Sequence, residues 1–246
     1  MTDSTSVILP AADAFKSGAL LMPQEFSAAV APSVLQWSDY PLNAILTALF
    51  TLLVLMTLKN FLNISHDLLA GISRWKACLN IEGSIQKMED RNLLGYIYTI
   101  PIAMMADRYS FIPASLAGTV PAQWHCLVPL GAILAWLFVK HFNFKVLELK
   151  ARRAETLRIA HKSFYNYWIL AAILMVMTAG AMALLHTSEP AAREVLLYEL
   201  GGMYLIGLLR ESQILGSAYS PIGVFLYLCA LELIPTGALV AAAILL

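Results

Sequence analysis

The chain has 246 residues, of which 59% are hydrophobic and 13% are charged, and its formal net charge is zero. Soluble domains carry about 25% charged residues. The low charge content and the long uncharged stretches therefore indicate a membrane protein and exclude an ordinary soluble domain. A neutral chain also lacks the basic surface that binds nucleic acid, so we expect no such partner.

Residues 1–40 are predicted to be a weakly ordered acidic tail. They carry four acidic residues against one basic residue, Lys16, and they are rich in Ala, Ser and Pro. The opening segment MTDSTSVILP has no basic residue, so it lacks the start of a secretory signal peptide. A tail with so few basic residues is readily exported, and we expect it outside the cell.

Residues 41–246 contain six apolar stretches, which we interpret as an all-α polytopic domain with six transmembrane helices. A bilayer core is crossed by about 20 helical residues. The second and fifth stretches are marginal by this measure, and a second stretch that re-enters the membrane without crossing it is the main alternative. The stretches are Leu42–Leu58, Leu93–Ala106 with an extension toward Ile112, Leu127–Val139, Tyr167–Leu185, Val195–Leu209 and Ile222–Leu246.

The distribution of basic residues predicts the orientation. With six crossings, thirteen of the sixteen Lys and Arg residues lie in connections on one side of the membrane, namely 59–92, 140–166 and 210–221. Basic connections stay in the cytoplasm. Both termini are therefore expected outside.

The connection 140–166 is predicted to contain an amphipathic cytoplasmic helix. No glycine or proline occurs between Gly131 and Gly180, and helix formers fill Val146–Lys162. Apolar residues recur there at about helical spacing. Contact with the lipid bilayer through basic residues is the simplest role, and a docking surface for other membrane proteins is the alternative.

The stretch LYLCALELIP, Leu226–Pro235, places one carboxylate inside the last apolar stretch. Glu232 lies about 15 Å along this helix from Ile222, near the middle of the bilayer, at about 1.5 Å of rise per residue. An ionised carboxylate is costly there, so Glu232 is expected to face the interior of the bundle. Pro235 removes the hydrogen bond to the carbonyl of Leu231 and is expected to kink the helix.

An intramembrane polar site is predicted around this glutamate. Cys229 and Thr236 share its helix face by three- and four-residue spacing. The Tyr204 hydroxyl is the expected partner, while Arg210 reaches Glu232 only with its full length. Two roles are considered for Glu232. It either forms an interhelical hydrogen bond that fixes the packing, or it binds a proton or a substrate. The predicted site comprises Glu232, Cys229, Thr236, Pro235, Tyr204 and Arg210.

The segment FLYLCALELIP, Phe225–Pro235, resembles the carboxy-terminal signature of an uncharacterised multi-pass membrane family of Bacteroidetes, a domain of unknown function. A looser similarity in the order of the apolar stretches extends from about residue 40 onward. The resemblance implies a protein of the bacterial inner membrane without an assigned activity. It carries over two positions, Glu232 and Pro235.

Cofactor chemistry has little support in the sequence. His125 and His186 lie at outer ends of the third and fourth stretches, and His141 and His161 at inner ends. Paired histidines on adjacent helices could ligate haem. However, these positions predict that the imidazole rings lie in water or among the lipid headgroups and not in a buried pocket. We find no Cys or His pair at metal-ligand spacing and no Gly-x-Ser-x-Gly or His-Glu-x-x-His motif. No cofactor, metal or catalytic residue is predicted.

Three function classes remain from the sequence, and a membrane enzyme is the least favoured of them because no catalytic set is visible. The first expectation is a structural or accessory subunit of an envelope complex, without turnover of its own. The alternative is a small proton-coupled transporter that uses Glu232. A cavity that reaches Glu232 would favour the transporter.

Overall fold

The computed structural model describes residues 37–111, 120–149 and 153–245. The regular structure in these residues is entirely helical, which confirms the all-α prediction for the described ranges. Of the predicted tail, residues 1–40, only residues 37–40 are described by the structure, so the prediction for residues 1–36 lies outside the described ranges. From Trp37 onward the described chain belongs to one compact unit.

Long helices dominate this unit, and prolines mark several of their starts. Pro41, Pro190 and Pro221 lie in the first turn of a helix, where the missing N–H leaves no bond unmade. The helices are α1 Pro41–Ser73, α2 Trp75–Glu82, α3 Ile85–Ile97, α4 Thr99–Arg108, α6 Leu127–Glu148, α7 Ala154–Leu184, α8 Glu189–Gly216, α9 Pro221–Leu228 and α10 Ile234–Leu245. A π-helix, Cys229–Leu233, joins α9 to α10, and short 3-10 turns cover Trp37–Asp39 and Ala122–Trp124.

Four helical segments among the described residues are long and apolar enough to cross a membrane. They are Pro41–Ser73, Ala122–Glu148, Ala154–Leu184 and Pro221–Ala241. These segments overlap four of the six predicted apolar stretches. The other two stretches fall in α8, which is long but more polar, and in α3 and α4, which meet at Tyr98.

Two predicted boundaries need correction. The third apolar stretch ends at Val139, but α6 continues to Glu148. Residues 140–166, predicted as a separate amphipathic connection, are instead the facing ends of α6 and α7, with residues 150–152 outside the described ranges. The physical reason is packing, since Phe144 and Leu157 are buried in a cluster with Ile214 of α8 and do not lie along a lipid surface.

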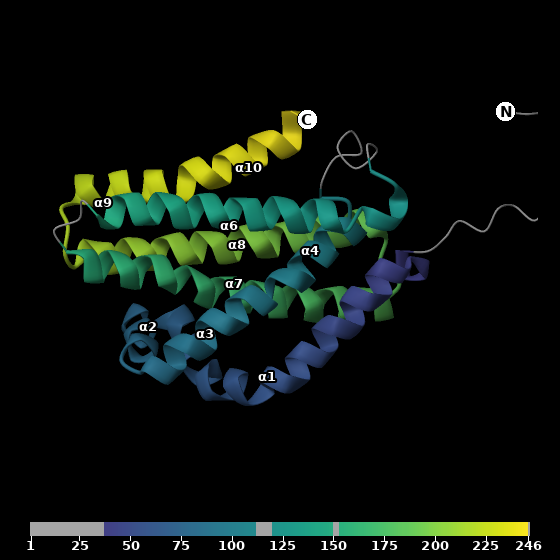
Figure 1. The fold of residues 1–246 in the computed structure, drawn as a ribbon, viewed down its shortest axis with the longest axis horizontal. Helices are drawn as coiled ribbons and strands as arrows, with labels where there is room; N and C mark the ends of the chain where they lie inside the picture. The colour runs from purple at the N-terminus through teal and green to yellow at the C-terminus, as the bar shows by residue number, and fades with distance from the viewer. Residues whose placement is uncertain (1–36, 112–119, 150–152, 246) are drawn as a thin grey trace, which may run out of the picture. The chain divides into compact units, whose positions relative to one another are not determined.

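The helices run alongside one another (Figure 1). α7 and α8 pack along each other as an antiparallel pair. α6 packs on α4 and α7, α9 packs on α8, and α10 packs on α6. α1 lies against α2 and α3. The main buried core joins α1, α2, α3, α4, α6, α7 and α8 through aromatic and aliphatic side chains.

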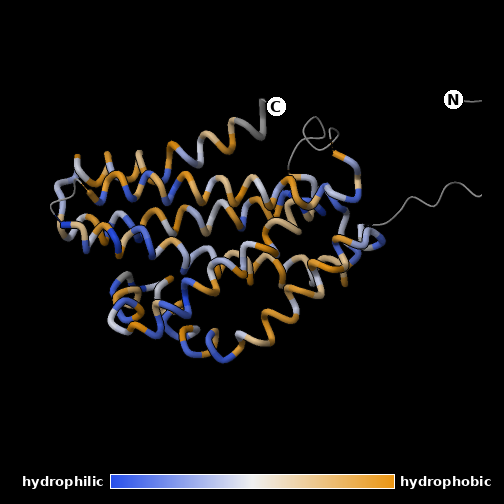
Figure 2. The backbone as a smooth tube through the Cα atoms, viewed as in Figure 1, coloured by the Kyte–Doolittle hydropathy of each residue, from blue (hydrophilic) through white to orange (hydrophobic). Residues whose placement is uncertain are grey.

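Polar residues gather where α1 ends and α3 begins. Figure 2 shows that α2 and the adjoining parts of α1 and α3 are more hydrophilic than the first half of α1. Lys87 binds Asp67 at 2.7 Å, and Asn63 donates to Asp90 at 2.7 Å. Arg91, fully buried, pairs with Glu82. These bonds attach α3 to the end of α1 and to α2.

Close contact between α3 and α7 depends on Gly95. A methyl group added there would lie 2.5 Å from Tyr165 Cδ1 and 3.3 Å from its Cβ. The Tyr165 ring is buried between Tyr96 and Phe164 and has little room to move. Gly95→Ala should therefore lower the free energy of unfolding by about 1–3 kcal/mol, as expected for overpacking. Thermal unfolding of the purified protein in detergent would measure this loss.

Gly131→Ala is the matched control for this prediction. The added methyl group has no atom within 4 Å among the described residues. Alanine also favours helix over glycine by about 1 kcal/mol, so this variant should unfold at the same temperature as the natural protein or higher. Equal losses in both variants would contradict the tight packing at Gly95.

Candidate intramembrane charged site

The π-helix Cys229–Leu233 is the local feature that builds the site. The Ile234 N–H bonds to the carbonyl of Cys229, five residues earlier. Continuing this register would require an N–H at residue 235 for the carbonyl of Ala230, but Pro235 has none. Asn143 of α6 supplies the missing donor, with Nδ2 at 3.4 Å from the Ala230 oxygen. The Ala230 carbonyl is therefore bonded by a side chain of α6 in place of a backbone N–H.

Glu232 lies in this π-helix and faces α6. Its side chain is 1% exposed, and its Oε1 lies 2.5 Å from the Lys140 Nζ. Lys140 is equally buried. The expected partner was the Tyr204 hydroxyl, so the structure replaces a neutral hydrogen bond with a buried ion pair between α6 and the π-helix.

Aromatic rings surround the Lys140 ammonium. Its Nζ lies 3.1 Å from the centre of the Phe164 ring and 5.6 Å from that of Trp136. Aromatic faces carry negative potential and attract cations most strongly where water is excluded. The lysine is thus stabilised by a carboxylate on one side and by α7 and α6 aromatics on the other.

A second carboxyl group joins the pair. Glu211 of α8 is 3% exposed and lies within hydrogen-bonding reach of Glu232. Lys140, Glu211 and Glu232, called the charged triad below, come from three different chain segments. Tyr204, Tyr167 and His161 lie near these groups as well. The triad holds two acidic groups against one lysine.

Lys140 and Glu211 lie toward one end of the bundle, and Glu232 lies near the middle of the last helical segment, Pro221–Leu245. Glu211 precedes the end of α8 by five residues, Lys140 precedes the end of α6 by eight, and Glu232 follows the start of α9 by eleven. At about 1.5 Å per residue, these positions lie about 8 to 16 Å from the helix ends that join the basic connections. All three groups are inside the helical bundle.

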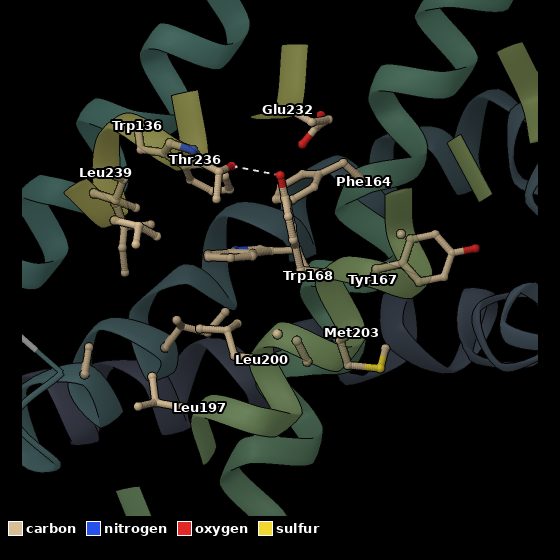
Figure 3. A pocket seen from close by; sticks show the side chains of 18 of the residues that line it. Trp136, Phe164, Tyr167, Trp168, Leu197, Leu200, Met203, Glu232, Thr236 and Leu239 are labelled. Carbon is tan, nitrogen blue, oxygen red and sulfur yellow. Dashed lines mark hydrogen bonds between the residues drawn. The ribbon is translucent and has the colours of Figure 1, made fainter. Parts of the chain in front are cut away.

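A cavity of about 480 Å³ borders the triad. Its wall comes from α4, α6, α7, α8 and α10 and is mostly aromatic and aliphatic, with Glu211, Glu232 and Thr236 among its polar members. Figure 3 shows the Glu232 carboxyl on the same side of the pocket as Thr236 and Phe164. Small-molecule sites have this size and this combination of apolar wall and few polar groups.

One wall of the cavity reaches the outside of the bundle. Val240 of α10 and Leu197 of α8 line the cavity and are 50% and 42% exposed. Figure 1 shows α10 bending away from the bundle after the π-helix. The bend follows from the π-helix and Pro235, because both disturb the regular helical register. The cavity therefore has a side open between α8 and α10.

The other predicted site residues take different positions. The Tyr204 hydroxyl donates to Thr236 Oγ1 at 3.0 Å, so both line the cavity next to Glu232. Arg210 donates to the Ile72 and Ser73 carbonyls, the second at 3.2 Å, and so ties α8 to the end of α1. Cys229 is half-buried at the first position of the π-helix.

Sequence reasoning missed Lys140 and Glu211. Lys140 directly follows Val139, the last residue of the third apolar stretch, and Glu211 directly follows Arg210. Both positions therefore fall in predicted cytoplasmic connections. The absence of glycine and proline after Gly131 was the signal that α6 continues past Val139. No comparable signal distinguishes Glu211.

His161 also departs from its expected position. It is 5% exposed and stacks on Phe144 with ring centres 4.2 Å apart, so it does not lie among headgroups. The His141 ring lies 6.3 Å away. Within the described ranges, no three His, Cys, Asp or Glu side chains gather closely enough to hold a metal ion.

The described fold and site define a helical protein with membrane-length helices and a buried charged triad beside a cavity. No family model, curated protein or solved structure matches the chain. The resemblance carried by Phe225–Pro235 stays a prediction.

The charge balance of the triad leads to a prediction about stability. Lys140→Met leaves two buried carboxyl groups without a cation, and loss of one partner of a buried pair costs about 3–5 kcal/mol. The double variant Lys140→Met with Glu232→Gln should recover most of this loss, since it removes both charges. Chemical unfolding of the four proteins in detergent would give the coupling energy.

Lys145 and Glu148 form the control pair. Their charged atoms lie 3.0 Å apart on α6, but Lys145 is 58% exposed, and such pairs contribute about 0–1 kcal/mol. Lys145→Met with Glu148→Gln should therefore show little coupling. Additive losses at Lys140 and Glu232 would mean that the buried pair does not stabilise the fold through its charges.

Proposed function

We propose that the chain crosses the membrane six times, with both termini outside. α3 and α4 together with Tyr98 span 24 residues from Ile85 to Arg108, and α8 has 28, which correspond to about 36 and 42 Å. The ends of α1, α6 and α8 lie at one end of the bundle in Figure 1, and the α7–α8 connection lies at the other. Successive connections at opposite ends of the bundle support six crossings. They also put the basic connections after α1, α6 and α8 on the same side of the membrane.

We further propose that the membrane is the inner membrane of a bacterium. The support is the resemblance of Phe225–Pro235 to the Bacteroidetes family. Lipid is the expected surrounding, because large apolar side chains such as Leu55, Met56 and Phe138 are 67%, 72% and 70% exposed. Burying this surface in acyl chains removes it from water.

Within this topology we propose a small proton-coupled transporter whose charged triad binds the proton. The observation that carries the proposal is the placement of two carboxyl groups, Glu211 and Glu232, in the wall of a cavity, with the Lys140 ammonium paired to Glu232 behind that wall. If both carboxyl groups were ionised, the triad would hold one uncompensated negative charge. A buried charge of this kind is costly in a membrane protein, and a proton on the carboxyl pair removes it.

The roles within the triad follow from its contacts. Lys140 contacts Glu232 and lies over the Phe164 ring. Among the described residues, Glu211 forms no ion pair of its own, and its carboxyl group lies within reach of both Glu232 and the Lys140 charge. The transferable proton therefore belongs to Glu211 and Glu232 together. Buried acidic groups of this type form proton relays in pumps and transporters.

An accessory role in an envelope complex rests on a different observation. Apolar side chains are exposed at the end of α6, including Phe142 and Leu149, which are 59% and 88% exposed. They lie within residues 140–166, the predicted docking surface for other membrane proteins. This role requires no cavity beside Glu232, so the cavity favours the transporter.

The orientation can be tested by cysteine labelling in a variant without the native Cys78, Cys126 and Cys229. Ser188→Cys, in the α7–α8 connection, should react with a membrane-impermeant maleimide in intact cells. Ser217→Cys, just after α8, should react only after permeabilisation. The reverse pattern would overturn the proposed orientation.

The proton site can be tested by infrared difference spectroscopy of purified protein after a pH jump. The natural protein should show the band of a carboxyl group that gains or loses a proton. Glu211→Gln and Glu232→Gln should each remove most of this signal, because the proton is shared. Glu194→Gln, an exposed position on α8, is the control and should leave it unchanged. A signal that survives both triad variants would remove the basis for proton coupling.

A further inference from the structure

We propose that the cavity binds a lipophilic organic cation, which takes the place of the proton on Glu211 and Glu232. This inference rests on the proposed proton site and names the class of its substrate. A molecule of this class has an apolar body and a single positive charge. Its binding would release the proton, and proton binding would release the cation.

The charges around the cavity select the sign of the ligand. Lys140 pairs with Glu232, so release of the shared proton leaves the triad with one more negative than positive charge. Tyr204 and Tyr167 are neutral phenols, His161 is stacked on Phe144, and Arg210 is bound to carbonyls of α1. An anionic head would add to the excess negative charge, whereas a cation would balance it.

The aromatic wall suits a cation with an apolar body. Trp136 and Phe164 each contact Trp168 with ring centres 5.5 Å apart, and all three line the cavity. The position of Lys140 shows that this wall accommodates a positive charge, because its ammonium lies over the Phe164 ring. A ligand cation near Glu211 would meet the same combination of carboxylate and aromatic faces.

The open side of the cavity supplies a route. Leu197 and Val240 border both the cavity and the outer surface between α8 and α10. That surface contacts lipid in the proposed topology, and lipophilic cations partition into bilayers. The volume of about 480 Å³ accommodates a drug-sized molecule. Entry from the bilayer therefore requires no path through water along the bundle.

The test uses tetraphenylphosphonium and the full chain purified in detergent. Equilibrium dialysis should show saturable binding that weakens as the pH falls, since protons compete for the same carboxyl groups. Binding in a weakly buffered solution should release up to one proton per chain, measured with a pH indicator. Glu211→Gln should remove the proton release and weaken binding by at least tenfold, while Glu194→Gln should change neither.

Tetraphenylborate is the matched control ligand, because it has nearly the same shape and the opposite charge. It should not bind at this site. Equal binding of both ions would show that the cavity selects shape and not charge, and would overturn the proposal. Ala132→Trp, which places a large ring in the cavity wall without touching the triad, should block the phosphonium ion in a folded protein.

The outcomes separate the two proposals. Absence of phosphonium binding, with the infrared proton signal of Glu211 and Glu232 intact, would overturn the substrate class alone. Absence of that proton signal would overturn the proton-coupled function itself. Retained binding in Ala132→Trp would place the ligand elsewhere on the protein and would also overturn the proposal.

Discussion

The structure depends on the burial of Lys140 against Glu232. Two opposite charges taken out of water are stable only with close geometry and further partners. The Phe164 ring on one side of the ammonium and Glu211 beside the carboxylate supply those partners. The need to bring these groups together constrains α6, α7, α8 and the π-helix at once, so the position of each helix depends on the others.

The same constraint explains the irregular last span. A regular α-helix ending in Pro235 would leave a carbonyl without its donor, whereas the π-helix moves the unmet acceptor to Ala230, within reach of Asn143. The extra residue in the π-turn also changes the direction in which Glu232 points. The bend after Pro235 then separates α10 from α8 and leaves the cavity between them. Ion pair, bend and cavity are consequences of one local departure from helical regularity.

The cavity and the triad together support the proposal of a binding site beside the packing role of the ion pair. Here two carboxyl groups accompany one ammonium, and both carboxyl groups line a cavity. An unequal charge beside a cavity is suited to binding a mobile positive species, whether a proton or a larger cation.

The amino-acid sequence by itself determined the helical class, four membrane-length segments and the burial of Glu232, because hydropathy and the cost of an exposed charge act locally along the chain. It also indicated that Pro235 would disturb its helix. It did not determine the partner of Glu232: an apolar stretch that ends at Val139 says nothing about whether Lys140 turns outward or inward. Only the tertiary structure decided this, because the pairing of Lys140, Glu211 and Glu232 depends on the depth and rotation of three helices distant in sequence. Those quantities are set by the packing of Phe144, Leu157 and Ile214 and by the π-turn.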